Sequence, residues 1–151
     1  MLTVSLLVCA LIALARADAT CPDNWSEFGG RCFHYVSVQM TWAEAEKNCQ
    51  AMKANLASVK NAEDNQNIQK LIRAASLNAT RTWIGGTDCQ MNDLWLWSDG
   101  SHFLFSAWHP GLPDNWGSNE ACIEINHGEE EGKWNDVQCS SQRPSVCALT
   151  L

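Results

Sequence analysis

Apolar residues recur at helical spacing in the segment that follows Thr41. Those at positions i, i+3, i+7 and i+10, which share one helix face, are Trp42, Ala45, Cys49 and Met52. Thr41 and Glu44 have the spacing of a capping box, in which each side chain accepts the backbone N–H of the other residue. The pattern predicts a helix that begins after Thr41 and runs to about Ala51.

A second apolar stripe predicts another helix, from near Asn61 to about Ala75. Its apolar face consists of Ile68, Leu71, Ile72 and Ala75. Before the first helix, the segment 28–35 has a Gly-Gly turn followed by aromatic residues, which is typical of a β-hairpin.

After Thr82 the sequence becomes rich in Trp, Gly and Asn, which indicates short strands and irregular connections. Two helices followed by such β structure predict a single α+β domain. The segment between Asp99 and Lys133 is long for an unsupported loop, so we expect a disulfide and a bound ion to hold its shape.

The first 17 residues are apolar and end in Ala15-Arg16-Ala17, a small-x-small cleavage site. They read as a secretory signal peptide that is too short to span a membrane. We therefore expect a secreted protein with one domain, 18–151. The formal net charge of −7 argues against a nucleic-acid-binding surface, and no nucleophile–base set indicates an enzyme.

Cysteines are numerous for a chain of this length. Cys9 lies in the signal, and the seven that remain are Cys21, Cys32, Cys49, Cys89, Cys122, Cys139 and Cys147. In a secreted protein these indicate disulfides, but the sequence alone leaves the pairing open. Because seven is odd, one cysteine stays free or pairs with another chain.

Side-chain oxygens gather at three separated points between Trp108 and Cys139. The residues that carry them are Asp114, Asn115, Glu120, Asn135 and Asp136. Oxygen ligands without a cluster of His or Cys are what Ca²⁺ prefers. The flat ring of Trp116 beside them suits the C–H face of a sugar whose hydroxyls bind the ion. The pattern therefore predicts calcium-assisted sugar binding, with ordinary polar loop residues as the alternative.

Motifs in this segment and elsewhere resemble those of the C-type lectin-like domain family. Pro113-Asp114 matches the second half of the family's Gln-Pro-Asp triplet, Glu120-Ala121-Cys122 its Glu-x-Cys step, and Trp134-Asn135-Asp136 its Trp-Asn-Asp motif. Other matching segments are Cys21-Pro22, Trp42 through Cys49, Asn55-Leu56-Ala57-Ser58-Val59, Trp83-Ile84-Gly85-Gly86, Trp95 through Gly100, and Val146-Cys147. The resemblance covers nearly the whole mature chain. It implies two helices packed on short antiparallel sheets, with a disulfide-stabilised, calcium-binding long loop.

The resemblance also implies a role for each matched residue. The implied calcium ligands are Asp114, Glu120, Asn135 and Asp136. The same side chains would bond the sugar hydroxyls, and Trp116 would stack on the sugar ring. Pro113 is expected to follow a cis peptide bond, and the carboxylate of Asp114 favours galactose-like over mannose-like sugars.

For the cysteines, the resemblance selects one pairing. The implied bridges are Cys21–Cys32, Cys49–Cys147 and Cys122–Cys139. Family members with a cysteine at the position of Cys89 often bridge it to one at the position of Ala121. Cys89 is therefore either a buried, inert thiol or the link of a disulfide-bonded homodimer.

The chain departs from the family at Leu112, where a Gln or Glu would bind both ion and sugar. Leucine supplies no oxygen, so water would have to take its place. Since ligand number and charge tune calcium affinity, we hypothesise that calcium binding is weak.

The leading hypothesis is a secreted, calcium-dependent lectin of galactose-like preference that recognises microbial surface glycans in innate immunity. The plan resembles short, single-domain, secreted lectins of fish. Type II antifreeze proteins share it, so ice binding is one alternative, and a lectin-like domain that binds protein without calcium or sugar is another. Asn78-Ala79-Thr80 is a glycosylation sequon, which predicts a glycan on Asn78.

Overall fold

A computed structural model describes residues 19–151 of the chain. The expected signal peptide, 1–17, lies outside these residues. Among the described helices, none has the length and apolar character of a membrane span. The elements, with η for a 3-10 helix, are β1 (Ser26–Phe28), β2 (Arg31–Met40), α1 (Trp42–Ala51), β3 (Asn55–Leu56), α2 (Ala62–Ser76), β4 (Thr82–Thr87), β5 (Leu96–Trp97), η1 (Trp116–Ser118), β6 (Cys122–Ile125), η2 (His127–Glu129), β7 (Trp134–Val137) and β8 (Arg143–Thr150).

Both predicted helices are confirmed, and each begins at a side-chain cap. The hydroxyl of Thr41 accepts the N–H of Glu44 at 3.3 Å, and the carboxylate of Glu44 accepts the N–H of Thr41 at 2.9 Å. At the start of α2, the side chain of Asn61 accepts the N–H of Asp64 at 2.9 Å. Because these caps satisfy N–H groups that a helix leaves free, short-range sequence is sufficient to set both starting points.

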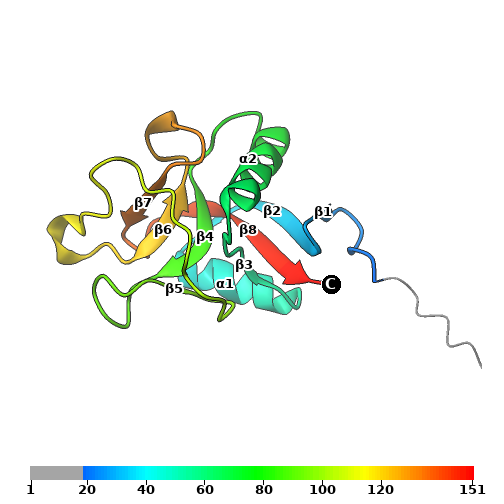
Figure 1. Ribbon diagram of the computed structural model, residues 1–151, viewed down its shortest axis with the longest axis horizontal. Coiled ribbons are helices and arrows are strands. Elements are labelled where there is room, and N and C mark those ends of the chain that lie inside the picture. Colours follow the sequence, from blue (N-terminus) through cyan, green and yellow to red (C-terminus); the bar gives the residue numbers. More distant parts are fainter. Residues whose placement is uncertain (1–18) are drawn as a thin grey trace, which may run out of the picture.

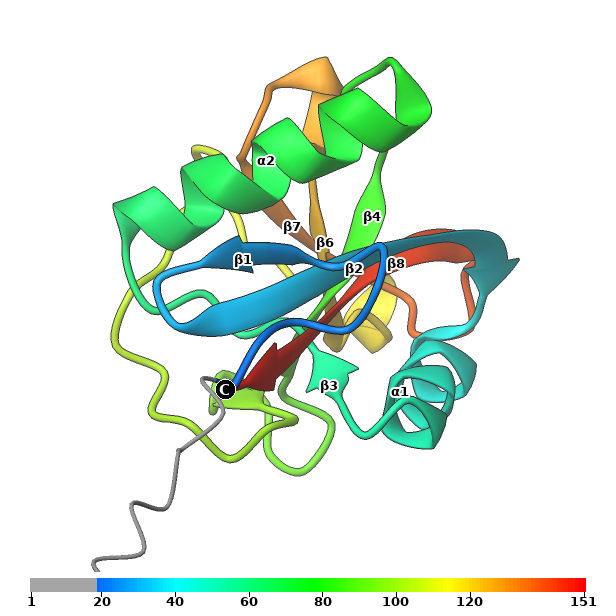
Figure 2. The ribbon, with the colours of Figure 1, turned by 90° about the vertical axis from the view of Figure 1, so that its right-hand side faces the viewer.

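One mixed sheet replaces the short antiparallel sheets that the resemblance implied. Its strands follow the order β1-β2-β8-β4-β6-β7, with β3 paired to β8 and β5 paired to β4. The contact between β4 and β8 is parallel, and the other strand pairs are antiparallel. The two helices lie on opposite sides of the β2–β8 pair (Figures 1 and 2). The domain is therefore α+β, as predicted.

Each helix covers its own part of the core. Ile68 and Ile72 of α2 are fully buried and belong to a cluster that includes Trp134. Ala45 of α1 is buried in a second cluster with Trp83. A fully buried tryptophan therefore belongs to each cluster, Trp134 to the first and Trp83 to the second.

Trp134 packs at the point where β7 approaches the long loop. Four aromatic rings meet its indole at steep angles, those of Trp97, Phe103, Phe105 and Trp108. Its ring N–H donates to the side-chain oxygen of Asn65 in α2 at 2.9 Å. Since Asn135 and Asp136 come next in the strand, this packing fixes where β7 presents them.

The disulfide pairing implied by the resemblance is confirmed. The bridges are Cys21–Cys32, Cys49–Cys147 and Cys122–Cys139. The second joins α1 to β8 across 98 positions, a loop for which chain-entropy arguments give about 4–5 kcal/mol. The third joins the start of β6 to the segment after β7, at the end of the molecule opposite the C-terminus (Figure 1).

Candidate functional site

Three carboxylates, two from the long loop and one from β7, meet at this end of the molecule. Asp114, Glu120 and Asp136 each place a carboxylate oxygen within 4.8 Å of the others. Two oxygens that bind one Ca²⁺ at about 2.3–2.6 Å lie at most about 5 Å apart, so this spacing fits a shared ion. The donors are hard oxygens, which suit calcium rather than a thiolate- or imidazole-preferring metal.

Asp136 is the buried member of the group, and it organises the loop above β7. Its Oδ1 accepts the backbone N–H of Asp114 at 3.1 Å, and its Oδ2 accepts that of Asn115 at 2.6 Å. The side chain has no exposed surface. Because a carboxylate oxygen has two lone pairs, each oxygen retains one for an ion.

The other two carboxylates share one backbone donor. The N–H of Trp116 lies 3.2 Å from Oδ1 of Asp114 and 3.1 Å from Oε2 of Glu120. Partial burial raises the pKa of Glu120, and the negative charges of Asp136 and Asp114 raise it further, against the opposing bond from Trp116. A cation among these groups would relieve the repulsion that they impose on one another.

Trp116 presents a large apolar ring beside the carboxylates. It begins η1, and its side chain is 72% exposed. A ring that stacks on a sugar has to be accessible, and that of Trp116 is, in contrast to the buried Trp83 and Trp134. An exposed indole next to polar groups can cover the apolar face of a ligand whose polar groups bind nearby.

Leu112 lies on the other side of Asp114 in the sequence, at the entry to the same loop. Its peptide bond to Pro113 is cis, as expected. Its N–H donates to the carbonyl of His109 at 3.0 Å, which ties down the backbone before the cis bond. The loop therefore has the backbone conformation expected at this position, with an aliphatic side chain where the family has an oxygen ligand.

Asn135, the fourth expected ligand, contacts a different group. Its amide nitrogen lies 3.3 Å from Oε1 of Glu124, which is opposite it in the β6–β7 register. Glu124 is fully buried and accepts a 2.7 Å bond from Nε of Arg143. Sequence reasoning missed Glu124, although a lone Glu within the apolar strand sequence Cys-Ile-Glu-Ile was a usable signal.

Asn92 is a second residue that the sequence did not single out. Its side-chain oxygen accepts the amide N–H of Asn115 at 2.8 Å, so the 88–95 segment touches the site loop directly. Residues of both segments, Cys89 and Glu120 among them, line a pocket of about 380 Å³ beside this contact. No sequence spacing indicated this contact.

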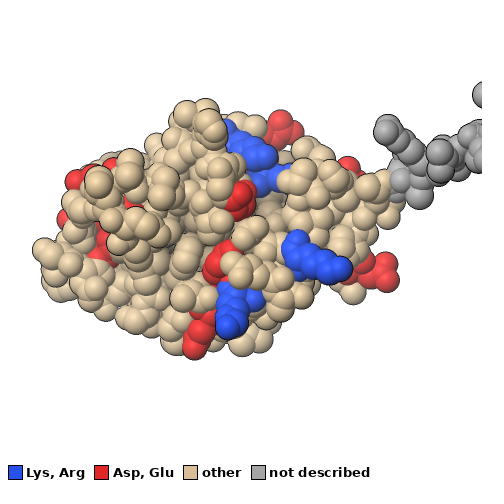
Figure 3. Space-filling view, turned by 90° about the horizontal axis from the view of Figure 1, so that it is seen from below, with Lys and Arg blue, Asp and Glu red and all other residues tan. Residues whose placement is uncertain are grey.

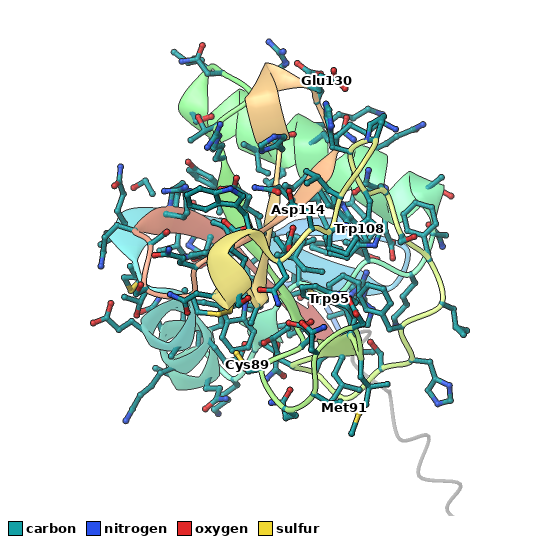
Figure 4. The ribbon with its side chains drawn as sticks, turned by 90° about the vertical axis from the view of Figure 1, so that its left-hand side faces the viewer. Cys89, Met91, Trp95, Trp108, Asp114 and Glu130 are labelled. Carbon is teal, nitrogen blue, oxygen red and sulfur yellow. A yellow bond between two sulfur atoms is a disulfide. The ribbon has the colours of Figure 1, made fainter. Side chains whose placement is uncertain are left out.

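Cys89 is exposed and makes no disulfide, so the expectation of a buried thiol was wrong. Its sulfur lies 3.7 Å from Sγ of Cys139, one half of the bridge that closes β6 on β7. In Figure 4, which looks onto this end, Cys89 and Asp114 lie on either side of the η1 turn.

Acidic groups characterise the surface at this end. On the face drawn in Figure 3, the left-hand end, where the long loop lies, shows Asp and Glu and no Lys or Arg. A surface of this charge attracts cations and disfavours polyanions.

The fold and this loop define a class of protein: disulfide-stabilised α+β domains with an oxygen-rich long loop. The family model of the Lectin C-type domain matches residues 38–149. The chain belongs to this family. The family is known for carbohydrate-binding and ice-binding proteins without catalytic activity, and the chain is not an enzyme.

Fish lectins and antifreeze proteins are similar over almost the full chain. Ladderlectin of Oncorhynchus mykiss is 36% identical over a gapped alignment of 174 residues, which covers 96% of this chain and 91% of that protein. The galactose-specific lectin nattectin of Thalassophryne nattereri is 39% identical over 136 residues, covering 90% and 84%. The structure of herring type II antifreeze protein superposes with a TM-score of 0.80 at 37% identity, covering 87% of this chain and 99% of that one.

Proposed function

We propose that the chain is a calcium-dependent lectin with a preference for galactose-like sugars. The observation that carries this proposal is the meeting of Asp114, Glu120 and Asp136 within 4.8 Å, beside the exposed ring of Trp116. Similarity to a galactose-specific fish lectin supports the choice of sugar. The ion would bind two adjacent hydroxyls, and the indole would cover the C–H side of the ring.

Each side chain has a separate task in this proposal. Asp114, Glu120 and Asp136 would bind the calcium ion, and Asp136 would also hold the loop through its two backbone bonds. Asn135 would contribute its side-chain oxygen, since its amide nitrogen is directed to Glu124. When bound, the ion supplies a Lewis acid for hydroxyl oxygens, which no side chain of this loop replaces.

Leu112 makes the proposed calcium affinity weak. Its aliphatic side chain offers no lone pair to the ion or to a hydroxyl, so water must fill the position. A titration in which the site is saturated at micromolar calcium would contradict the weak affinity. It would not contradict the identity of the calcium ligands.

Affinity chromatography tests the function directly. The protein is applied to immobilised galactose in millimolar calcium and eluted with EDTA, with immobilised mannose as the matched control. Retention on galactose alone, released by EDTA, is the expected result. Flow-through on galactose in calcium overturns the proposal, and retention that survives EDTA overturns its calcium dependence.

Ice binding is the second candidate, because herring type II antifreeze protein is similar in both fold and sequence. The observation that favours it is Leu112, which makes the loop surface less polar than a complete calcium site would. Thermal hysteresis separates the two functions: a hysteresis gap with no galactose retention replaces the lectin proposal by ice binding. A protein ligand bound without calcium or sugar would be left if both assays were negative.

The remaining parts of the proposal concern the setting of the protein. We also propose that the protein is secreted and recognises microbial glycans in innate immunity. The signal-like residues 1–17 support secretion, and the similarity to fish lectins supports glycan recognition. The exposed Asn78 is the proposed glycosylation site, tested by a mass shift after glycosidase treatment.

The exposed thiol of Cys89 is also the proposed link of a disulfide-bonded homodimer. A non-reducing gel that shows monomer alone would exclude this dimer.

A further inference from the structure

Three sulfur atoms lie together beside the candidate calcium site. Those of Cys89, Cys122 and Cys139 fall within 4.8 Å of one another, and the thiol of Cys89 is 3.7 Å from Sγ of Cys139. Cys122 and Cys139 are joined, whereas Cys89 is free and exposed. A nucleophile therefore lies against an electrophile of the kind that thiolates attack.

We propose that Cys89 exchanges with the Cys122–Cys139 bridge, so that the chain exists as two disulfide isomers. One isomer has the Cys122–Cys139 bond and a free Cys89. The other has a Cys89–Cys139 bond and a free Cys122. The geometry selects Cys139 as the sulfur attacked, because its Sγ lies 3.7 Å from the thiol of Cys89.

The reaction is balanced within the chain. The thiolate of Cys89 attacks Sγ of Cys139, the bond to Cys122 breaks, and Cys122 leaves as a thiolate that takes up the proton released by Cys89. One disulfide and one thiol are present before and after, so neither an oxidant nor a reductant is needed.

Attack requires a change in the direction from which the thiol approaches the bridge. The thiol lies beside the bridge rather than on the extension of its axis, since all three sulfurs fall within 4.8 Å of one another. Cys89 is exposed, and exposed side chains change rotamer within picoseconds to nanoseconds. Rotation of this side chain is therefore fast compared with thiol–disulfide exchange, which takes seconds or longer.

The backbone keeps the thiol close to the bridge. The carbonyl of Ala121, adjacent to Cys122, accepts the hydroxyl of Thr87 at 2.7 Å and the N–H of Asp88 at 3.1 Å. The N–H of Cys89 in turn donates to the hydroxyl of Thr87 at 3.2 Å. Because these bonds hold the two segments together, exchange within one molecule is favoured over exchange between molecules.

The exchange changes what braces the candidate site. In the first isomer, the bridge ties Cys122, two residues after Glu120, to the segment that follows β7 and Asp136. In the second isomer this tie is replaced by one from the 88–95 segment. The link to calcium rests on the function proposed above, whereas the exchange itself does not. If calcium prefers the first isomer, linkage requires that calcium shift the isomer ratio toward it.

Disulfide mapping of the intact, folded protein tests the proposal. The protein is incubated without added thiol at about pH 8.5 and in parallel at about pH 6. Free thiols are then trapped with N-ethylmaleimide in acid before digestion. Trypsin alone leaves Cys89 and Cys122 on one peptide, 82–133, because no Lys or Arg lies between Arg81 and Lys133, so chymotrypsin is added.

The expected result is two populations. One carries the label on Cys89 with a Cys122–Cys139 peptide, and the other carries it on Cys122 with a Cys89–Cys139 peptide. Approach to the final ratio should be more than tenfold slower at about pH 6, because the thiolate is the attacking species. Label on Cys89 alone after prolonged incubation at the higher pH overturns the proposal.

Two controls make the outcome specific. Cys89→Ser removes the nucleophile and should abolish the Cys122 label without disturbing the three native bridges. A tenfold dilution should leave the isomer ratio and its rate unchanged, and a rate that falls with dilution overturns the intramolecular route. Repeating the mapping in calcium and in EDTA tests the link to the site separately: an unchanged ratio overturns the link and leaves the exchange standing.

Discussion

The carboxylate of Asp136 accepts the backbone N–H of Asn115 at 2.6 Å, across 21 positions of sequence. Together with the 3.1 Å bond from Asp114, this contact fixes the site loop to the end of β7 without help from an ion. The candidate site is therefore partly organised by the protein itself. An ion that entered it would meet ligands that are already ordered, which lowers the entropy cost of binding.

Asp136→Asn should destabilise the protein even in EDTA. The asparagine has one oxygen, so one of the two backbone N–H groups would face an NH₂ group and lose its acceptor. Leaving a buried donor unsatisfied costs about 1–3 kcal/mol, more than is regained from reduced repulsion with Glu120. Thermal unfolding of both proteins in EDTA measures the difference.

Asp114→Asn is the matched control for that experiment. Asp114 is exposed, and its oxygen accepts the N–H of Trp116, which an amide oxygen can also do. This variant should keep its stability in EDTA and lose only the stabilisation that calcium adds. Equal stability of Asp136→Asn and wild type in EDTA would contradict the structural role of Asp136.

Leu112→Gln should strengthen calcium and galactose binding together. Glutamine supplies one oxygen at the position where Leu112 supplies none. One added ligand should raise calcium affinity by roughly an order of magnitude, or about 1.4 kcal/mol. Calorimetric titration is the measurement, and Leu112→Met, similar in length but without the oxygen, should behave as wild type. A gain in the methionine variant would mean that side-chain shape, not coordination, limits binding.

The helices were predictable from sequence because their signals are local. Thr41 and Glu44 cap one another within three residues, and Asn61 caps the helix that begins beside it. The disulfide pairing and the cis bond before Pro113 came from family resemblance, not from spacing or composition. In physical terms, sequence patterns predict contacts between residues that are one or two helical turns apart. The contacts between residues distant in sequence were predicted from the family resemblance.

The contacts that escaped prediction join segments that are distant in sequence. Asn92 meets Asn115, and Cys89 meets Cys139, only because the 88–95 segment folds back beside β6. The strand order that places β4 between β8 and β6 has no local signal either. Glu124 was identifiable as an unusual residue in an apolar strand, but its partner Arg143 depends on the fold.

Trp116→Ala should weaken galactose binding without changing stability. The side chain is 72% exposed, so its removal takes little apolar surface out of the core. Loss of an aromatic contact should cost about 0.5–1.5 kcal/mol, or roughly 2- to 12-fold in affinity. Trp116→Phe should retain part of the affinity, because a flat apolar ring remains. Binding titrations and melting curves together separate the two effects, and an unchanged affinity for the alanine variant would exclude stacking.

Arg143→Met should be among the more damaging single substitutions in the β sheet. Glu124 is fully buried, and Nε of Arg143 lies 2.7 Å from its carboxylate. Removing one partner of a fully buried pair costs about 3–5 kcal/mol. The loss should be at or below the lower end, because the Arg143 side chain is 23% exposed and Arg81 remains 3.7 Å from the same carboxylate. Urea denaturation measures the loss.

Two further variants establish whether the unpaired charge is the cause. Glu124→Gln combined with Arg143→Met should recover part of the stability, since no charge is left uncompensated. Arg73→Met breaks an ion pair with Glu131 in which both side chains are largely exposed, and it should cost less than about 1 kcal/mol. Equal losses for Arg73→Met and Arg143→Met would refute the distinction.

Asp99 should make stability depend on pH below neutrality. Burial alone would raise its pKa, but bonds from Ser101 and Ser58, with the positive charge of Arg31, hold it below its ordinary value. The unfolded pKa is near 3.9, so the stabilisation is complete above about pH 5 and is lost as pH falls through the lower folded pKa. The stability difference between wild type and Asp99→Asn should therefore shrink below about pH 4, as measured by urea denaturation across pH. Ser101→Ala removes a donor to this carboxylate and should reduce the pH dependence, whereas a difference that grew in acid would mean that burial dominates.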